Sequence, residues 1–457
     1  MIDNSTIEQF EAIFRGRLIK PDDSDYDGAR TIYNAMIDKR PRLIARCADV
    51  ADVIEAVNFG RKHELDTAIR SGGHNGPGLA LVDDGLVLDL SAMKGIRVDP
   101  ESKTARVEAG CHWGDVDHAT HAFGLATVSG IIGTTGVSGL TLGGGHGYLS
   151  RKYGLTIDNL LAADVVLADG QLVHASEDHN PDLFWALRGG GGNFGVVTSF
   201  EYRLHPVDTV FAGPLFWPIE QLEPTLRWYR EWLPQAPESI YAFFMVGEVP
   251  AAEPFPEIIH GRKICGLLWC CTGPQDTSAA AVQSARDVAE PLFEHIGPMP
   301  YPFLQGLFDS LFPPGYQWYW KGDFVGELTD KAIAQHLRFA EVPTPLSMMH
   351  LYPINGAVHQ VDSQDTAWSY RDANWSMVIA GVDPDPANRE KITRWARDYW
   401  EALHPLSAGA SYVNFMMEEG DDRVKATYGA NHERLRKIKA KYDPENFFHV
   451  NQNIKPA

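Results

Sequence analysis

Three glycine-rich blocks constrain the fold of this chain more than any other feature. They read "RSGGHNGPG" at residues 70–78, "GTTGVSGLTLGGGHG" at 133–147 and "GGGGNFG" at 189–195. Glycine tolerates positive φ and close backbone approach, and successive N–H groups in such turns form anion-binding nests. Three converging turns would suit a long ligand that carries a diphosphate, whereas three unrelated hairpin turns are the alternative.

Neither common nucleotide motif explains these blocks. Gly190, Gly192 and Gly195 match G-x-G-x-x-G, but that fingerprint needs a strand before the glycines and a helix after them. Here the helix-like run "DLFWAL" comes before and the strand-like run "GVVTSFEYRL" comes after. The block at 133–147 is followed by "YLSRK" and lacks the Gly-Lys-Ser/Thr ending of a phosphate-binding loop.

The coarse pattern along the chain indicates an α+β protein with a boundary near Pro206. Residues 49–65 have the apolar spacing of a helix, and "TARVEAG" at 104–110 alternates as a half-buried strand does. After Pro206 the glycine clusters end, and aromatic residues and prolines become frequent. We therefore expect residues 206–410 to form a separate domain.

Composition excludes several function classes. The net charge is −20 over 457 residues, which argues against nucleic acid and anionic membranes as partners because both need clustered Lys and Arg. No stretch of about 18 apolar residues and no signal-peptide pattern occurs, so we expect a cytoplasmic protein. The five cysteines show no disulfide or zinc spacing, and His118 and His121 lack further ligands, so no metal is expected.

Four motifs occur in an order that resembles a known family. They are "RSGGHN" (70–75), "GTTGVSGLTLGGGHGYLSRKYGLTIDNLLAADVVLADG" (133–170), "NPDLFWALRGGGGNFGVVT" (180–198) and "YDPENFFHVNQNI" (442–454). Together they resemble the berberine-bridge-enzyme-like branch of the vanillyl-alcohol-oxidase flavoproteins. The resemblance extends from about residue 30 to the C-terminus and is weakest in the middle of the chain.

The resemblance implies an α+β fold with two domains. Residues 1–205 would form an FAD-binding domain of two subdomains, to which residues 411–457 return as a C-terminal segment. Residues 206–410 would form a substrate domain with a large antiparallel sheet backed by helices. This division agrees with the change of composition at Pro206.

The resemblance also implies the cofactor and its contacts. His74 would be bonded through a ring nitrogen to the 8α carbon of FAD. Some members add a cysteinyl link, but the matching position here is Ile132, so we expect no second bond. The predicted cofactor residues are Arg70, Ser71, Gly72, Gly73, His74, Asn75, Gly133, Thr134, Thr135, Gly136, Gly139, Gly143, Gly144, Gly145, Gly147, Asn159, Gly195, Val197, Asn451 and Asn453.

The implied reaction is hydride transfer from a CH–OH or CH–NH group of a small organic substrate to the flavin. Thr135 stands where side-chain bulk is thought to control oxygen access, and its small size favours an oxidase that uses O2 and releases H2O2. A dehydrogenase with another electron acceptor is one alternative. A non-catalytic flavin-bearing binding or resistance protein is another.

The catalytic base is the least determined part of the site. The plant enzymes of the family use a tyrosine where Phe415 stands, and their glutamate matches a position near Met377, so both plant bases are missing. An amine substrate, once neutral, needs less help from a base. The predicted catalytic residues are Tyr148, as first choice, with His146, Tyr370 and Asn414. The predicted substrate contacts are His350, Tyr352 and Phe415, and aromatic residues such as Trp318 and Trp320 suit a ring-bearing substrate.

Overall fold

The computed structural model describes residues 3–253 and 255–457, and its first sheet holds the first glycine block. Four strands lie in the order β1-β2-β4-β3, and β2, β4 and β3 run parallel. The crossover from β2 to β3 is the predicted helix α3, and β3 ends at Arg70, where the first glycine block begins. The bounds are β1 Arg17–Ile19, β2 Leu43–Arg46, β3 Thr67–Arg70, β4 Leu86–Asp89, α1 Asn4–Ile13, α2 Tyr26–Ala29 and α3 Val50–Lys62.

The other two glycine blocks lie in connections between strands of a second, fully antiparallel sheet. Its order is β5-β6-β10-β8-β9, and the strands predicted at 104–110 and after Gly195 are β6 and β10. The second block forms the short helix α5 and the turns after it, and the third follows the predicted helix α7. The bounds are β5 Ile96–Asp99, β6 Thr104–Glu108, α4 Trp113–His121, β7 Leu125–Ala126, α5 Val137–Leu142, α6 Ser150–Tyr153, β8 Leu160–Val166, β9 Leu172–Ser176, α7 Pro181–Leu187, β10 Val196–Arg203 and β11 His205–Pro206.

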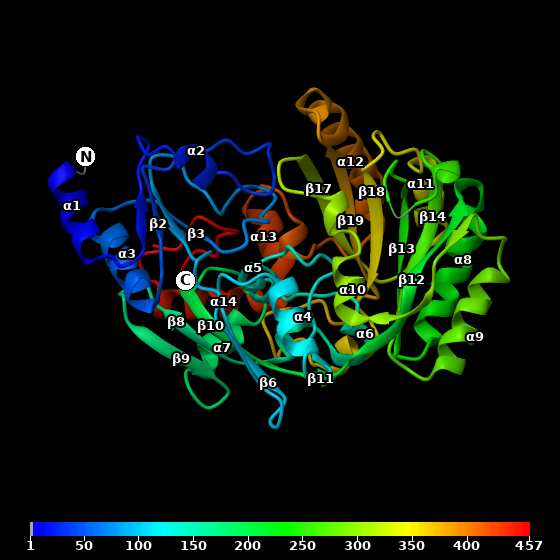
Figure 1. Ribbon diagram of the computed structural model, residues 1–457, viewed down its shortest axis with the longest axis horizontal. Helices are drawn as coiled ribbons and strands as arrows, with labels where there is room; N and C mark the ends of the chain where they lie inside the picture. The colour runs from blue at the N-terminus through cyan, green and yellow to red at the C-terminus, as the bar shows by residue number, and fades with distance from the viewer. Residues whose placement is uncertain (1–2, 254) are drawn as a thin grey trace.

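The large antiparallel sheet predicted for the middle of the chain is present, with eight strands. Its order is β15-β12-β14-β13-β18-β19-β17, with β16 paired to β12 (Figure 1). The bounds are β12 Thr209–Pro218, β13 Ile240–Glu248, β14 Lys263–Cys271, β15 Phe293–Glu294, β16 Gly297–Pro300, β17 Gln317–Val325, β18 Met348–Pro353 and β19 Trp375–Asp383.

Four helices cover one face of this sheet, and part of the other face packs against α10. Alternate strand residues such as Phe244 and Val246 share one hydrophobic core with Leu226, Ile333 and Ala396 of the covering helices. Their neighbours on the other face point toward the glycine-rich half of the molecule, because successive side chains of a strand alternate. The helices are α8 Leu222–Trp232, α9 Gln275–Arg286, α11 Asp330–Arg338 and α12 Arg389–Leu403; α10 Tyr301–Gly306 lies beside α4.

The C-terminal segment packs against the first half of the chain. It contains α13 (Asp421–Tyr428) and α14 (His432–Tyr442), and the Tyr442 hydroxyl donates to Asp182 of α7 at 2.8 Å. Both chain ends lie at the same side of the molecule in Figure 1. The domain limits at residues 205 and 410 stay a prediction. Within the described residues, no helix is both long and apolar enough to span a membrane.

Arg151 joins α6 to the eight-stranded half through buried carbonyls. Its guanidinium donates to the Asn355 side chain at 2.8 Å and to the backbone oxygens of Ala236 and Leu233 at 2.9 and 3.2 Å. It also contacts the carbonyl oxygen of Ile240. The side chain is fully buried, so these neutral acceptors replace the water that a cation requires.

Asp117 is a second buried polar link between the halves. On α4, it accepts a hydrogen bond from Gln305 of α10 at 3.1 Å, and the same amide contacts the Ser129 hydroxyl at 2.5 Å. Burial raises the pKa of Asp117 to about 7, and the nearby Asp309 carboxylate adds to the rise. The folded protein therefore retains this proton over a pH range in which the unfolded chain releases it.

Replacement of Asp117 by asparagine tests this link. The folded-state pKa is raised, so the contribution of Asp117 to the free energy of unfolding falls as the pH rises from about 4 to about 7. The melting temperature of Asp117→Asn, relative to that of wild type, should therefore rise between pH 5 and pH 8. Thermal denaturation at each pH measures this difference. The exposed Asp178→Asn change is the control, and equal pH profiles for wild type and Asp117→Asn would contradict the assignment.

Candidate functional site

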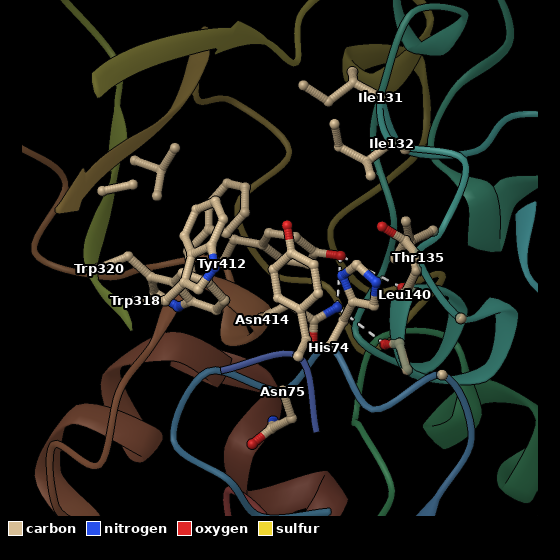
Figure 2. Close-up of a pocket in the computed structure, with 18 of the residues that line it drawn as sticks. His74, Asn75, Ile131, Ile132, Thr135, Leu140, Trp318, Trp320, Tyr412 and Asn414 are labelled. Atoms are coloured by element: carbon tan, nitrogen blue, oxygen red, sulfur yellow. Dashed lines mark hydrogen bonds between the residues drawn. The ribbon is translucent and has the colours of Figure 1, made fainter. Parts of the chain in front are cut away.

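A cavity of about 440 Å³ separates the half of the molecule that holds the three glycine blocks from the eight-stranded sheet. The cavity lies on the sheet face opposite to α8, α9, α11 and α12. Residues of all three glycine blocks, of the C-terminal segment and of six strands of the eight-stranded sheet line it. Figure 2 shows part of this wall, with His74 near the centre, Trp318 and Trp320 on one side and Ile131, Ile132 and Thr135 on the other. Segments that lie far apart in the sequence thus form one site.

The first two glycine blocks touch backbone to backbone. A Cβ atom added to Gly72 would lie 2.5 Å from the Gly136 nitrogen, and one added to Gly136 would lie 2.5 Å from the Gly72 nitrogen. The hydroxyls of Ser71 and Ser138 both donate to the carbonyl oxygen of Ala109, at 2.5 and 2.7 Å. Only glycine fits at both contact positions, and the two serines fix the blocks to the same carbonyl.

His74 lies in the wall just after this contact. Its ring stacks on Tyr33, with centroids 4.0 Å apart and planes inclined by 17°. Burial lowers the pKa of His74 to about 3, and the nearby His112 adds to the fall. The imidazole is therefore neutral at physiological pH, and a neutral ring nitrogen carries the lone pair needed to form a bond to carbon.

The wall beside His74 contains no thiol. Ile131, Ile132 and Thr135 lie there, on the second glycine block and just before it (Figure 2). All five cysteines of the chain are buried and unpaired, and none of them lines the cavity. His74 thus presents a neutral imidazole to the cavity, as His146 and His350 do.

The third glycine block and the C-terminal segment form the far wall. Gly191, Gly192 and Asn193 face the cavity beside Asn451, whose amide donates to the Gly192 carbonyl at 3.2 Å. The buried Lys439 ammonium donates to the Asn193 carbonyl at 2.7 Å, and also to the Phe448 carbonyl and the Asp443 carboxylate. One cation thus holds both wall segments in place.

The wall fits a long cofactor that is held by backbone groups. A Cβ atom at Gly139 or Gly192 would meet no atom within 4 Å, so both positions leave open space. The side-chain oxygen of Asn451 is buried without a partner in the described structure. No lysine or arginine among the described residues lines the cavity, so a diphosphate there would depend on backbone N–H groups and neutral side chains.

Eleven of the predicted cofactor residues line the cavity. They are Ser71, Gly72, Gly73, His74, Asn75, Thr135, Gly136, Gly139, Gly195, Val197 and Asn451. The other nine are not among the residues that line the cavity, and their role in cofactor binding stays a prediction. These are Arg70, Gly133, Thr134, Gly143, Gly144, Gly145, Gly147, Asn159 and Asn453.

For several of these residues the structure shows a packing role. Arg70 is buried and pairs with Asp89 at 2.6 Å, so it anchors the end of β3. The glycines at 143–147 let protein segments approach each other: a Cβ at Gly143 would collide with Asn414, and one at Gly147 with the carbonyl of Ser129. The Asn159 amide donates to the carbonyl oxygens of Tyr153 and Leu155, so it closes a local turn.

Two of the proposed bases also lie outside the wall. Tyr148 packs behind it against Tyr241 and Phe243, and burial raises its pKa well above the usual range. The Tyr370 hydroxyl donates to the Ala426 carbonyl at 2.9 Å. The role of Tyr148 as the base stays a prediction; its hydroxyl is enclosed by core residues and has no partner in the described structure.

The structure brings the remaining candidates together. His146, Asn414, Phe415, His350 and Tyr352 all line the cavity. The His146 ring lies 4.8 Å from the Tyr412 ring and 5.3 Å from the Tyr352 ring, between centroids. Burial lowers the pKa of His146 to about 3, and both ring nitrogens lack a partner in the described structure.

Asn414 links this group to the second glycine block. Its amide donates to the Gly139 carbonyl at 3.0 Å and to the Tyr412 hydroxyl at 2.7 Å. The His350 Nδ1 atom and the Tyr352 hydroxyl lie 2.6 Å apart in a hydrogen bond. Two neutral histidines and a tyrosine therefore meet at one end of an otherwise apolar chamber.

Several wall residues escaped the sequence analysis. Tyr33, Gly191 and Gln452 line the cavity, as do Met245 and Met348 of the sheet. Gly191 lies inside the third glycine block. That block fits no nucleotide motif, so the sequence does not distinguish Gly191 from the other glycines of the block. Tyr33 lies in an unpatterned loop, and only its contact with His74 reveals its role.

The fold and the glycine-walled cavity define a flavin-dependent oxidoreductase. A family model described as "FAD binding domain" matches residues 41–176, and one described as "Berberine and berberine like" matches residues 411–455. The chain is 32% identical to (R)-6-hydroxynicotine oxidase of Paenarthrobacter nicotinovorans over 97% of each chain. It therefore belongs to the berberine-bridge-enzyme-like FAD-linked oxidoreductases.

Solved structures agree with this assignment. The crystal structure of 6-hydroxy-D-nicotine oxidase from Arthrobacter nicotinovorans superposes with a TM-score of 0.87 at 29% identity, covering 97% of this chain and 98% of that one. A BBE-like protein of Physcomitrella patens superposes with a TM-score of 0.88 at 25% identity, covering 99% of both chains. The whole chain, and not only its first half, shares the architecture.

Substitution of Gly72 by alanine should disrupt the wall. Its Cβ would collide with the backbone of Gly136, so we expect a stability loss of about 1–3 kcal/mol and at least tenfold less bound flavin. Unfolding in denaturant and the flavin-to-protein absorbance ratio measure the two effects. Gly28→Ala is the matched control, since a Cβ there meets nothing within 4 Å. A Gly72→Ala protein with normal flavin content would contradict the contact's role.

Proposed function

We propose that this protein is an oxidase that carries FAD on His74 and oxidises a CH–OH or CH–NH group of a small organic substrate. The observation that carries the proposal is the place of His74, which is neutral, held by Tyr33 and part of the cavity wall. Ile132 stands where a cysteine would make a second bond, so the link is single. When bound, FAD supplies a hydride acceptor that O2 can reoxidise with release of H2O2.

The chain's own groups hold the cofactor and exclude water. The turns at Gly72, Gly136 and Gly192 present backbone N–H groups to a diphosphate, and Asn451 adds its unpartnered oxygen. Thr135 lines the cavity, and its small side chain supports oxygen access. A dehydrogenase and a non-catalytic flavin-bearing binder are the alternatives that the experiments below separate.

Proton transfer from the substrate would fall to the polar group at the inner end of the cavity. Phe415 cannot accept a proton, and Tyr148 does not reach the cavity. His146 and the His350–Tyr352 pair are neutral and line it. Asn414 would orient the reacting group, because its amide is already fixed by two hydrogen bonds.

The proposed compartment is the cytosol. The five cysteines are all buried and all free in the structure, as expected in a reducing environment.

Replacement of His74 by alanine tests the covalent link. In wild type we expect the yellow colour to stay with protein that has been denatured and precipitated. In His74→Ala it should move to the supernatant, although some FAD should still bind the native protein. His118→Ala, on the exposed face of α4, should behave as wild type. A colourless wild-type precipitate would overturn the proposal.

Anaerobic reduction separates the three candidate functions. A substrate should bleach the wild-type flavin, and His74→Ala should be reduced on the order of tenfold more slowly because the tether raises the flavin's potential. Colour that returns in air within seconds supports an oxidase, and recovery over many minutes identifies a dehydrogenase. The absence of bleaching by alcohols, sugars, cyclic amines and phenols would leave only the binding protein.

A further inference from the structure

The cavity face of the eight-stranded sheet carries mainly apolar and aromatic side chains. Alternation along each strand sends one set of residues to the helices and the other set to the cavity. Six of the cavity-facing residues are Phe243, Met245, Leu268, Trp320, Met348 and Val378, and all are apolar or aromatic. A substrate that lies on this face therefore meets a surface that offers few hydrogen bonds.

Three polar residues occur among the described strand residues that line the cavity, Glu248, His350 and Tyr352, and the last two pair with each other. His350 and Tyr352 stand two positions apart on β18, so both point to the same face. Their 2.6 Å hydrogen bond leaves the second ring nitrogen of His350 without a partner in the described structure. Each side chain keeps a few per cent of its surface, 8% and 5%, and both line the cavity.

The apolar surface extends well beyond this pair. The Phe243 ring packs 4.9 Å from His350 and 5.0 Å from Tyr352, between centroids. From Phe243 to Glu248 the strand β13 advances about 16 Å, at about 3.3 Å per residue. Met245 and Gly247 line the cavity between these two positions. The sheet side of the cavity thus has the polar His350–Tyr352 pair at one place and a stretch of apolar residues beside it.

Charge is almost absent from the wall. Among the described lining residues Glu248 is the single carboxylate, and there is no lysine or arginine. Burial lowers the pKa of His350 to about 3, so this histidine adds no positive charge at neutral pH. A buried carboxylate on the ligand would lose its hydration without gaining a partner, and so would most hydroxyls of a sugar.

From these features we infer that the substrate is an uncharged, ring-bearing apolar molecule whose single hydroxyl or amine bonds to the Tyr352–His350 pair. This inference rests on the proposed function only in that the bonded group is the one oxidised. The apolar face selects the body of the molecule, and Tyr352 selects its polar group. Sugars and aryl carboxylates are rejected because the wall leaves their polar atoms unpaired.

Binding to the flavin-loaded protein tests the inference without repeated turnover, because each flavin is reduced at most once when O2 is absent. Four probes share one assay, anaerobic ultrafiltration with the flavin difference spectrum as a second readout: 2-naphthalenemethanol, 2-methylnaphthalene, 2-naphthoate and cellobiose. We expect 2-naphthalenemethanol to bind at least tenfold more tightly than 2-naphthoate and cellobiose, and at least threefold more tightly than 2-methylnaphthalene. Equal or tighter binding of cellobiose or 2-naphthoate, or no binding of 2-naphthalenemethanol, would overturn it.

A pair of variants tests the polar anchor. Tyr352→Phe should bind 2-naphthalenemethanol and 2-methylnaphthalene equally, because it lacks the hydroxyl that distinguishes them. Tyr241→Phe, which removes an enclosed hydroxyl behind the wall, should keep the wild-type preference. A Tyr352→Phe protein that still prefers the alcohol threefold would overturn the anchor. If that variant does not fold, the wild-type preference for the alcohol over the hydrocarbon decides.

The outcome is separable from that of the proposed function. Binding of 2-naphthalenemethanol without bleaching would count against the redox proposal and leave the substrate class standing. Bleaching of the flavin by cellobiose, without binding of 2-naphthalenemethanol, would count against the substrate class and leave the redox proposal standing.

Discussion

The site depends on the contact between Gly72 and Gly136. Each glycine occupies space that the other's side chain would need, so the end of β3 and the start of α5 meet backbone to backbone. This contact puts His74 and Thr135 into the same wall, although 61 residues separate them in the chain. No hydrogen bond or charge could replace it, because the constraint is one of volume. Ser71 and Ser138 secure the arrangement by donating to one shared carbonyl.

Buried cations hold the rest of the cavity to this centre. Lys439 has no exposed surface and satisfies its ammonium on two carbonyls and the Asp443 carboxylate, which brings the C-terminal segment to the third glycine block. Arg151 does the same between α6 and the eight-stranded half. A buried cation left without its acceptors is costly, so these links are specific as well as strong. The cavity is therefore built by contacts made outside it.

The eight-stranded sheet performs two tasks with its two faces. The face covered by helices contributes Phe244 and Val246 to a packed core, and the opposite face contributes Phe243 and Met245 to the cavity. The same alternation that stabilises the domain thus provides a chamber wall without additional structure. Because such a wall is apolar by default, the one polar pair on it stands out as the feature that a substrate must match.

Local patterns in the sequence predict α3, β6, α7, β10 and the α+β class, since helical and strand periodicity and glycine turns act over short distances. The large antiparallel sheet and the role of His74 were implied by the resemblance of the ordered motifs to a known family. Only the tertiary structure decided which residues face the cavity and which pack inside the protein. Gly72 and Gly143 look alike in the sequence, yet one faces the cavity and the other packs on Asn414. Packing encloses the Tyr148 hydroxyl, which the sequence cannot show, because whether a side chain faces a cavity or a core depends on segments distant in the chain.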